Sequence, residues 1–182
     1  QAAAMAMGRA MDDVIIAAAT ATAFTGETGA TSTAPQTAIA AGGAGLTIAK
    51  LRTAKQTFDI GDVDPSITRH IVVSPEQITN LLATTEVTSS DFNTVKALVQ
   101  GEINSFLGFN FTVSNRLSKT GNDRTCIAFA QDGLTLAIGK DINARIDERA
   151  DKSYATQVYY CQTIGATRME EAKVLGIVCQ EA

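Results

Sequence analysis

Hydrophobic residues recur with a helical period of three to four positions in four parts of the chain, which predicts four helices. The first is rich in alanine, a strong helix former, and its apolar face includes Met7, Met11 and Val14. The pattern leaves the end of the fourth helix open, because the period continues past a glycine. The predicted helices cover residues 2–23, about 47–58, 74–82, and a stretch that begins near residue 90 or 91.

The third helix has the sharpest start signal. A short apolar stretch runs directly into Ser74, Pro75, Glu76 and Gln77. Serine is a preferred N-cap residue, and proline suits the first helical position because its missing N–H is not needed there. Gln77 is placed to complete a capping box by returning a hydrogen bond to the backbone of Ser74. The pattern therefore predicts a helix whose start is capped by Ser74 and Gln77 together.

Alternating apolar and polar positions predict strands in the second half of the chain. Between Tyr154 and Cys179 the sequence is rich in Val, Tyr, Ile and Thr and contains no proline. We expect two long strands there, joined or bent at the charged group 168–173. Helices followed by strands of this kind predict an α+β fold. Shorter strands are predicted over residues 71–73, 109–113, 126–129, 134–138 and 142–146.

Residues 25–45 consist mainly of Thr, Gly, Ala and Ser, so we expect a long surface loop that buries little. Its end, Gly42 to Gly45, precedes a helix and could suggest a phosphate-binding loop. No predicted strand leads into it, however, and Leu46 and Thr47 occupy the positions where such a loop needs Lys and Ser or Thr. A flexible loop end is the better interpretation.

Composition and charge exclude some classes of protein. The chain has 182 residues, of which 45% are hydrophobic and 19% charged, which is typical of a globular protein with one or two domains. Its net charge of −4, without clustered basic residues, disfavours a dedicated nucleic-acid binder. No apolar run approaches the roughly 20 residues of a membrane helix.

The chain offers few residues for catalysis or metal binding. His70 is the only histidine and lies at the start of a predicted strand, where a surface position without a catalytic role is the simpler interpretation. Cys126, Cys161 and Cys179 are too widely spaced for a zinc motif or a disulfide framework, and we expect them to be buried as small hydrophobic residues. The sequence therefore predicts no enzyme activity, no cofactor and no metal site.

Two pairs of adjacent carboxylates and one sequon carry no further signal. Neighbours such as Asp12 and Asp13, or Glu170 and Glu171, point in different directions on a helix or strand, so neither pair forms a catalytic dyad. The glycosylation sequon that begins at Asn110 lies within a predicted strand.

A run of alternating charges stands between the predicted strands of the last third. It is either an exposed edge with weak ion pairs or a surface that pairs with another subunit, and the pattern alone leaves both interpretations open. The candidate inter-subunit residues are Arg145, Asp147, Glu148, Arg149, Asp151 and Lys152.

Several segments, taken in order, resemble the major capsid proteins of tailed bacteriophages. Residues 1–20 resemble the second half of the long spine helix of that family. The other matching segments read LTIAKLR at 46–52, HIVVSPEQITNLL at 70–82, DFNTVKALVQGEINSFLGF at 91–109 and TIGATRMEEAKVLGIVC at 163–179. Their order along the chain carries the resemblance, because none is a catalytic signature.

The resemblance implies the Hong Kong phage capsid-type fold, which encapsulin shells also use. Residues 1–24 and 140–182 would form a peripheral domain, with the spine helix and long antiparallel strands, and residues 25–139 a central mixed axial domain. The subunits would assemble into pentamers and hexamers of an icosahedral shell around the phage genome. The protein would be located in the virion capsid, and the capsid would be assembled in the host cytoplasm.

The same resemblance implies the partners. The chain would bind other copies of itself, together with scaffolding and portal proteins, and would touch packaged DNA only weakly and without specificity. The family's N-terminal arm and extended hairpin loop have no counterpart here, and Gln1 falls inside the helical pattern, which indicates a fragment or a processed product. Two alternatives stay open: an encapsulin-like compartment, and an α/β enzyme or ligand-binding domain with a deep polar pocket.

Overall fold

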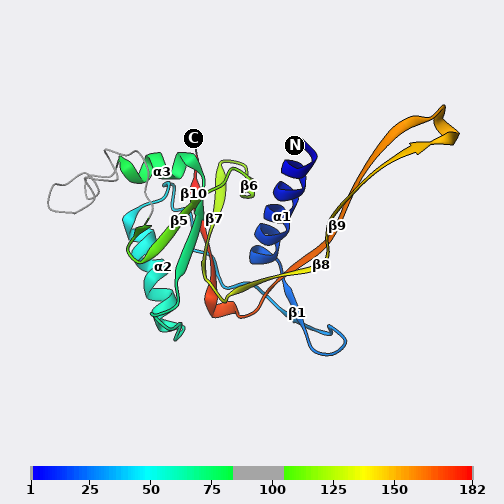
Figure 1. Ribbon diagram of the computed structural model, residues 1–182. Coiled ribbons are helices and arrows are strands. Elements are labelled where there is room, and N and C mark those ends of the chain that lie inside the picture. Colours follow the sequence, from blue (N-terminus) through cyan, green and yellow to red (C-terminus); the bar gives the residue numbers. More distant parts are fainter. Residues whose placement is uncertain (1, 84–104, 182) are drawn as a thin grey trace.

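The structure is a computed structural model that describes residues 2–83 and 105–181. Figure 1 shows a compact body around a sheet, one long helix beside it, and a two-stranded arm that reaches far from both. The helix predicted from residue 90 or 91 lies outside the described residues. The elements are α1 (Ala2–Thr20), β1 (Ala23–Thr25), β2 (Thr31–Thr33), α2 (Ile48–Ile60), β3 (Arg69–Val73), α3 (Pro75–Leu82), β4 (Ser105–Phe106), β5 (Phe109–Val113), β6 (Lys119–Thr120), β7 (Asp123–Ala130), β8 (Leu134–Arg149), η1 (Ala150–Lys152), β9 (Ala155–Arg168), η2 (Glu171–Lys173) and β10 (Val174–Gln180).

A mixed central sheet forms the body. Its strand order is β10-β7-β3-β5-β4, and β6 pairs with β7 beside this path. β3 and β5 run parallel, whereas the other neighbours are antiparallel. The predicted α+β class is therefore confirmed, with helices and a mixed sheet in one body.

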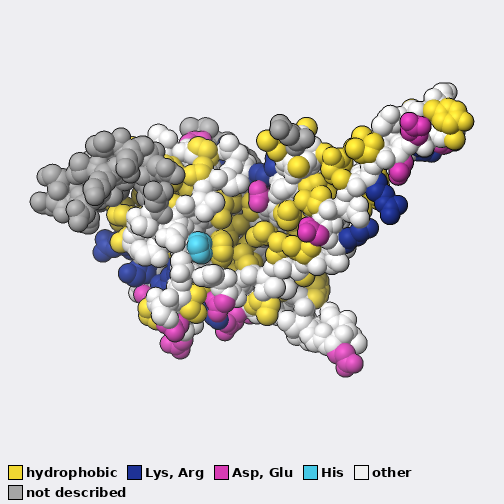
Figure 2. Space-filling model, in the orientation of Figure 1, with side chains coloured by type: hydrophobic (Ala, Val, Ile, Leu, Met, Phe, Trp, Pro, Cys, Tyr) yellow, Lys and Arg dark blue, Asp and Glu magenta, His cyan; other side chains and the backbone are white. Residues whose placement is uncertain are grey.

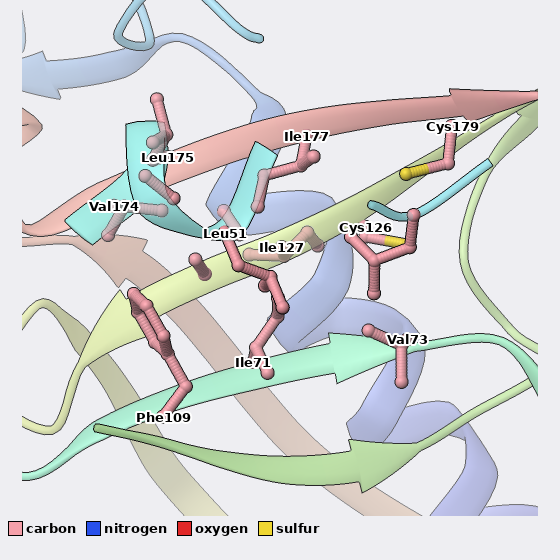
Figure 3. Packing of buried hydrophobic residues seen from close by; sticks show 14 of the residues in the cluster. Leu51, Ile71, Val73, Phe109, Cys126, Ile127, Val174, Leu175, Ile177 and Cys179 are labelled. Atoms are coloured by element: carbon pink, nitrogen blue, oxygen red, sulfur yellow. The ribbon is translucent and has the colours of Figure 1, made fainter. Parts of the chain in front are cut away.

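The core lies between α2 and one face of this sheet. Leu51, Ala54 and Phe58 recur at helical spacing on α2 and are fully buried. They belong to the same core cluster as the inward residues of the strands, among them Ile71 of β3 and Ile177 of β10. Figure 3 shows the side chains of Leu51 and Ile71 pointing toward each other. The strict alternation of buried and half-buried residues along β3 follows from the two-residue period of a strand.

The chain that follows α1 is more ordered than a surface loop. β1 and β2 form a hairpin, and the backbone of Ile39 then bonds the edge strand β10, accepting from Val178 (2.8 Å) and donating to Gly176 (2.9 Å). Residues 25–45 bury little, as expected, since most of them are exposed and none is fully buried, but they are not a plain loop, because small side chains let this segment approach and pair with β10. A Cβ added to Gly176 would stand 3.2 Å from that of Ala38.

The predicted start of α3 is confirmed in one half only. The Ser74 hydroxyl accepts a hydrogen bond from the backbone N–H of Gln77 at 3.4 Å, as an N-cap does. The side chain of Gln77 does not return to Ser74. It accepts from the Leu46 N–H at 2.6 Å and donates to the Gln180 carbonyl at 3.2 Å. Tertiary partners have replaced the local one, so the predicted capping box was wrong.

The predicted boundaries near the ends of the chain fall differently in the structure. The first helix ends at Thr20, not at residue 23, because β1 begins at Ala23. The predicted peripheral segment 140–182 is divided between two sheets. β8 and β9 form the separate two-stranded sheet of the arm, whereas β10 pairs along its whole length with β7 in the central sheet.

Candidate inter-subunit surface

The candidate surface is the arm formed by β8 and β9. The two strands pair antiparallel from Leu134 opposite Arg168 out to Arg149 opposite Ala155, with register shifts near Lys140. At the tip, the Tyr154 N–H donates to the Arg149 carbonyl at 3.0 Å. Figure 1 shows the distal half of the arm standing clear of the rest of the molecule. A two-stranded ribbon of this length has little to stabilise it alone, since such hairpins are marginal in water.

The two faces of the distal arm differ in chemistry. Ala144 stands opposite Tyr160 and Ile146 opposite Val158, so these four side chains share one apolar face. On the other face Arg145 stands opposite Tyr159 and Asp147 opposite Gln157. The apolar face is uncovered: Ile146 is 70% exposed and Val158 54% exposed. Single exposed hydrophobic residues are ordinary, but a contiguous row of them is typical of an interaction surface.

Helix α1 covers the base of the same apolar face. The Gln162 side-chain amide donates to the Met7 carbonyl of α1 at 3.4 Å, and Ile164 and Ala166 are half-buried beside it. Beyond Gln162 the face continues toward the tip without a cover within the described residues. Figure 2 shows hydrophobic side chains along this part of the arm. The apolar face of the arm is thus covered by α1 at the base and exposed in the distal half.

The structure places the six predicted interface residues on the distal arm, all exposed. Arg149 and Asp151 form an ion pair with each other across the tip, and the hydrogen bond from Arg149 lowers the pKa of the Asp151 carboxyl. The other four have no ion-pair partner among the described residues: Arg145, Asp147, Glu148 and Lys152. Arg145 and Asp147 lie on the polar face of the arm.

A shallow hollow of about 420 Å³ lies along the polar face of the arm. Its lining combines two cations and one carboxylate with amide, phenol and thiol groups. Because nearly all of its walls are exposed strand residues, it is a surface groove and not the deep polar pocket that the enzyme alternative predicts. The lining residues are Lys140, Asn143, Arg145, Asp147, Gln157, Tyr159 and Cys161.

Arg168 anchors the arm to the body, which sequence reasoning missed. Its buried guanidinium donates to the carbonyls of Ala19 (3.3 Å), Ala21 (2.8 Å) and Thr33 (3.0 Å). Two of these carbonyls lie at the carboxyl end of α1, where backbone oxygens lack helical partners. One side chain therefore joins α1, β2 and the end of β9. The charged group at 168–173 was visible in the sequence, but nothing in it showed that Arg168 would be buried.

A buried carboxylate ties the end of the chain to α3. Glu181 is 2% exposed and accepts hydrogen bonds from the Ser74 hydroxyl and from Arg124 Nε at 2.7 Å, with Lys119 Nζ at 3.3 Å. Burial alone would raise the pKa of this carboxyl. The hydrogen bonds from Arg124, Ser74 and Lys119 outweigh burial and lower the pKa to about 2. Glu181 is therefore ionised inside the protein at neutral pH.

Lys50 gives the glycine-rich segment surroundings that differ from those of a phosphate-binding loop. Its ammonium group, in a side chain that is 9% exposed, donates to the carbonyls of Ala44 (2.7 Å), Gly45 (3.0 Å) and Val178 (3.0 Å). A phosphate cradle needs inward-pointing N–H groups, whereas this turn directs carbonyl oxygens at a cation. The sequence interpretation that rejected a phosphate loop therefore gains a structural reason.

The histidine and the cysteines occupy ordinary positions. His70 lies half-buried on β3 and stacks on Phe129 with ring centroids 5.5 Å apart. Cys126 and Cys179 are buried in the core as free thiols, and Cys161 is half-buried on β9. A hydrogen bond with Cys179, together with burial, raises the pKa of Cys126, so this thiol stays protonated.

The adjacent carboxylates act as separate ion-pair partners. Asp13 pairs with Arg116, whose hydrogen bond lowers the pKa of the Asp13 carboxyl. Glu170 pairs with Lys173 at 2.7 Å, while Glu171 approaches Arg168 at 3.9 Å.

Across residues 2–83 and 105–181, no helix is long and apolar enough to cross a membrane. The same residues contain no cluster of three or more His, Cys, Asp and Glu side chains that could hold a metal ion.

The sequence matches the family model described as phage capsid protein over residues 1–181. The chain belongs to the phage capsid protein family. This confirms the resemblance drawn from the ordered segments. The comparison with curated protein sequences finds no match.

Solved structures of phage capsids share the fold. A chain from Mycobacterium phage Che8 matches with a TM-score of 0.67 at 19% sequence identity, over 97% of this chain and 61% of that one. The head of Helicobacter pylori bacteriophage KHP40 matches with a TM-score of 0.68 at 14% identity, over 96% and 66%. The capsid of Ralstonia phage GP4 gives 0.67 at 12%, over 95% and 64%. The predicted capsid fold is confirmed, and this phage capsid chain spans less than two thirds of the length of these relatives.

Proposed function

We propose that this phage capsid chain is a structural subunit of an icosahedral shell that encloses the phage genome, and that it works by self-association into pentamers and hexamers. The observation that carries the proposal is the family match across residues 1–181. The exposed apolar face of the β8–β9 arm supports it, because a projecting ribbon with an uncovered face needs another surface to stabilise it. Its place is the virion capsid, assembled in the host cytoplasm.

The partners in this proposal are other copies of the chain, with scaffolding and portal proteins as further contacts. Packaged DNA would touch the shell only weakly, since a net charge of −4 does not favour phosphate binding. We propose no catalytic role. The encapsulin-like compartment is not favoured, because the matching family is that of phage capsids.

The domain division is part of the same proposal. α1 and the arm would form the peripheral domain, and the central sheet with α2 and α3 the axial domain. Because β10 pairs with β7, we place residues 174–180 with the axial strands and end the peripheral part at Arg168.

Electron microscopy and analytical ultracentrifugation of the full-length protein test the proposal. We expect shells, tubes or capsomers. The matched variant replaces residues 140–163 by a tight turn, which removes the distal arm and leaves β10, β7 and α1 in place. It should keep the helical signal of its circular dichroism spectrum and lose the large assemblies. A wild-type protein that stays a monodisperse monomer in every buffer tested would exclude a shell function.

A further inference from the structure

The outer edge of β8 is one of the two unpaired strand edges of the arm within the described residues. Within the described residues β8 pairs with β9 alone, so its other edge presents a row of unpaired backbone N–H and C=O groups. Such an edge is a template for another strand. Charged side chains can block pairing at an edge or direct it to one register, and their order along the strand decides between these effects.

The charges on β8 are self-complementary in one register. Arg145 and Asp147 lie two positions apart on the same face and have no ion-pair partner within the described part of the chain. If a second β8 pairs antiparallel about a two-fold axis at Ile146, each Arg145 stands opposite Asp147 of the other copy. Directly opposite residues in such a pair have Cβ atoms about 5 Å apart, within reach of an Arg–Asp ion pair.

Neighbouring registers oppose like charges. An axis at Asp147 would place this carboxylate against its own copy and Arg145 against Arg149. An axis at Arg145 would oppose two arginines. An axis at Glu148 would oppose two glutamates and place Asp147 opposite Arg149, which already forms an ion pair with Asp151 of its own chain. Like charges that stand directly opposite are destabilising, so the sequence of charges selects the axis at Ile146.

We propose that two copies of this phage capsid chain join through their β8 edges about a two-fold axis at Ile146. The product is a four-stranded antiparallel sheet in the order β9-β8-β8-β9. The proposal deepens the proposed function, on which it rests, by naming the partner strand and its register.

The apolar faces support the same geometry. A two-fold axis perpendicular to the sheet keeps Ile146, Val158 and Tyr160 of both copies on one side. The Ile146 pair and the two Val158 side chains then form one apolar row across the four strands, and each Glu148 stands beside this row, opposite Ala144 of the other copy. A strand-edge contact is smaller than a stable interface of about 1,000 Å² or more, so it acts together with the other contacts of a shell.

Disulfide trapping in the full-length protein tests the register. The background variant is Cys161→Ser, because Cys161 is the cysteine that is not buried. Under a mild oxidant such as diamide, Ile146→Cys should form a covalent dimer, since each new thiol faces its own copy. The matched control is Ala144→Cys on the same strand and face. Its copies would stand roughly 13 Å apart, too far for a disulfide, so we expect at least about tenfold less dimer.

Two further cysteine variants mark the rival arrangements. A dimer from Glu148→Cys in place of Ile146→Cys would show an axis at Glu148, and a dimer from Thr156→Cys would show pairing through β9. Either result would overturn the proposal. So would the absence of any dimer in particles that assemble normally, an outcome that leaves the shell function intact.

Charge reversal provides an independent readout in the Ile146→Cys background. Arg145→Asp should abolish the dimer, because it opposes two carboxylates. Adding Asp147→Arg restores opposite charges across the axis and should restore the dimer. Failure of this rescue contradicts the pairing. Failure of the wild-type protein to assemble, seen by electron microscopy, instead contradicts the proposed function.

Discussion

The buried carboxylate of Glu181 offers the sharpest test of what stabilises this phage capsid chain. Its hydrogen bonds from Ser74, Arg124 and Lys119 lower its pKa from the ordinary 4.5 to about 2. One pKa unit corresponds to about 1.4 kcal/mol of preference for the ionised group, so the folded state gains up to about 3 kcal/mol at neutral pH.

The perturbation is Glu181→Gln, which keeps the size of the side chain and removes its charge. Arg124 and Lys119 then lose their common counter-charge. We expect the free energy of unfolding to fall by about 3 kcal/mol at pH 7, and the melting temperature by roughly 6–12 °C for a chain of this size. The matched control is Glu27→Gln, the same change at an exposed residue on the turn between β1 and β2, which should leave both values unchanged.

The pH dependence separates this effect from a packing defect. A carboxyl whose pKa is lowered on folding contributes its full stability above the unfolded pKa, and loses it as the pH falls through the folded pKa. The difference between wild type and Glu181→Gln should therefore shrink between about pH 5 and pH 2, to about half at pH 3. Urea denaturation at pH 7, 5 and 3 measures it. A difference below about 0.5 kcal/mol at pH 7, or one that is equal at all three values, refutes the reasoning.

Four other sites give single-variant predictions. Arg168→Met leaves three carbonyls at the base of the arm without donors and should lower the free energy of unfolding in urea by about 3 kcal/mol. An unchanged free energy of unfolding would contradict the buried position of this guanidinium. Lys50→Met should lower the free energy of unfolding by a similar amount, because it also leaves three carbonyls without their donor. An unchanged free energy of unfolding would contradict these three hydrogen bonds. Gly45→Ala would place a Cβ 2.5 Å from the Asn80 amide nitrogen and should destabilise by about 1–3 kcal/mol, whereas Gly8→Ala, with open space in α1, should stabilise by up to about 1 kcal/mol when melting is followed by calorimetry.

Much of the secondary structure could be predicted from local pattern. The N-cap at Ser74 depends on residues within one helical turn of each other, so its signal lies in adjacent positions. The long strands of the last third follow in the same way from β-branched and aromatic composition, with the break near residues 168–173 where η2 stands.

The predicted capping box shows where local pattern stops. Gln77 stands at the right position in the sequence, yet its amide bonds Leu46 and Gln180, which lie 31 and 103 residues away. The buried charges of Lys50, Arg168 and Glu181 belong to the same class. Nothing beside these residues in the sequence distinguishes them from exposed Lys, Arg and Glu, because their partners come from distant segments.

The arm combines both kinds of information. The sequence by itself determined the charge order of residues 145–152 and the alternation that makes one face apolar, because both depend on a two-residue period. Within residues 2–83 and 105–181, the tertiary structure decided that β8 pairs with β9 alone, that α1 covers only the base of the apolar face, and that β10 turns back into the central sheet. Which face is covered depends on packing between elements far apart in the chain, and that packing leaves no periodic trace in the sequence.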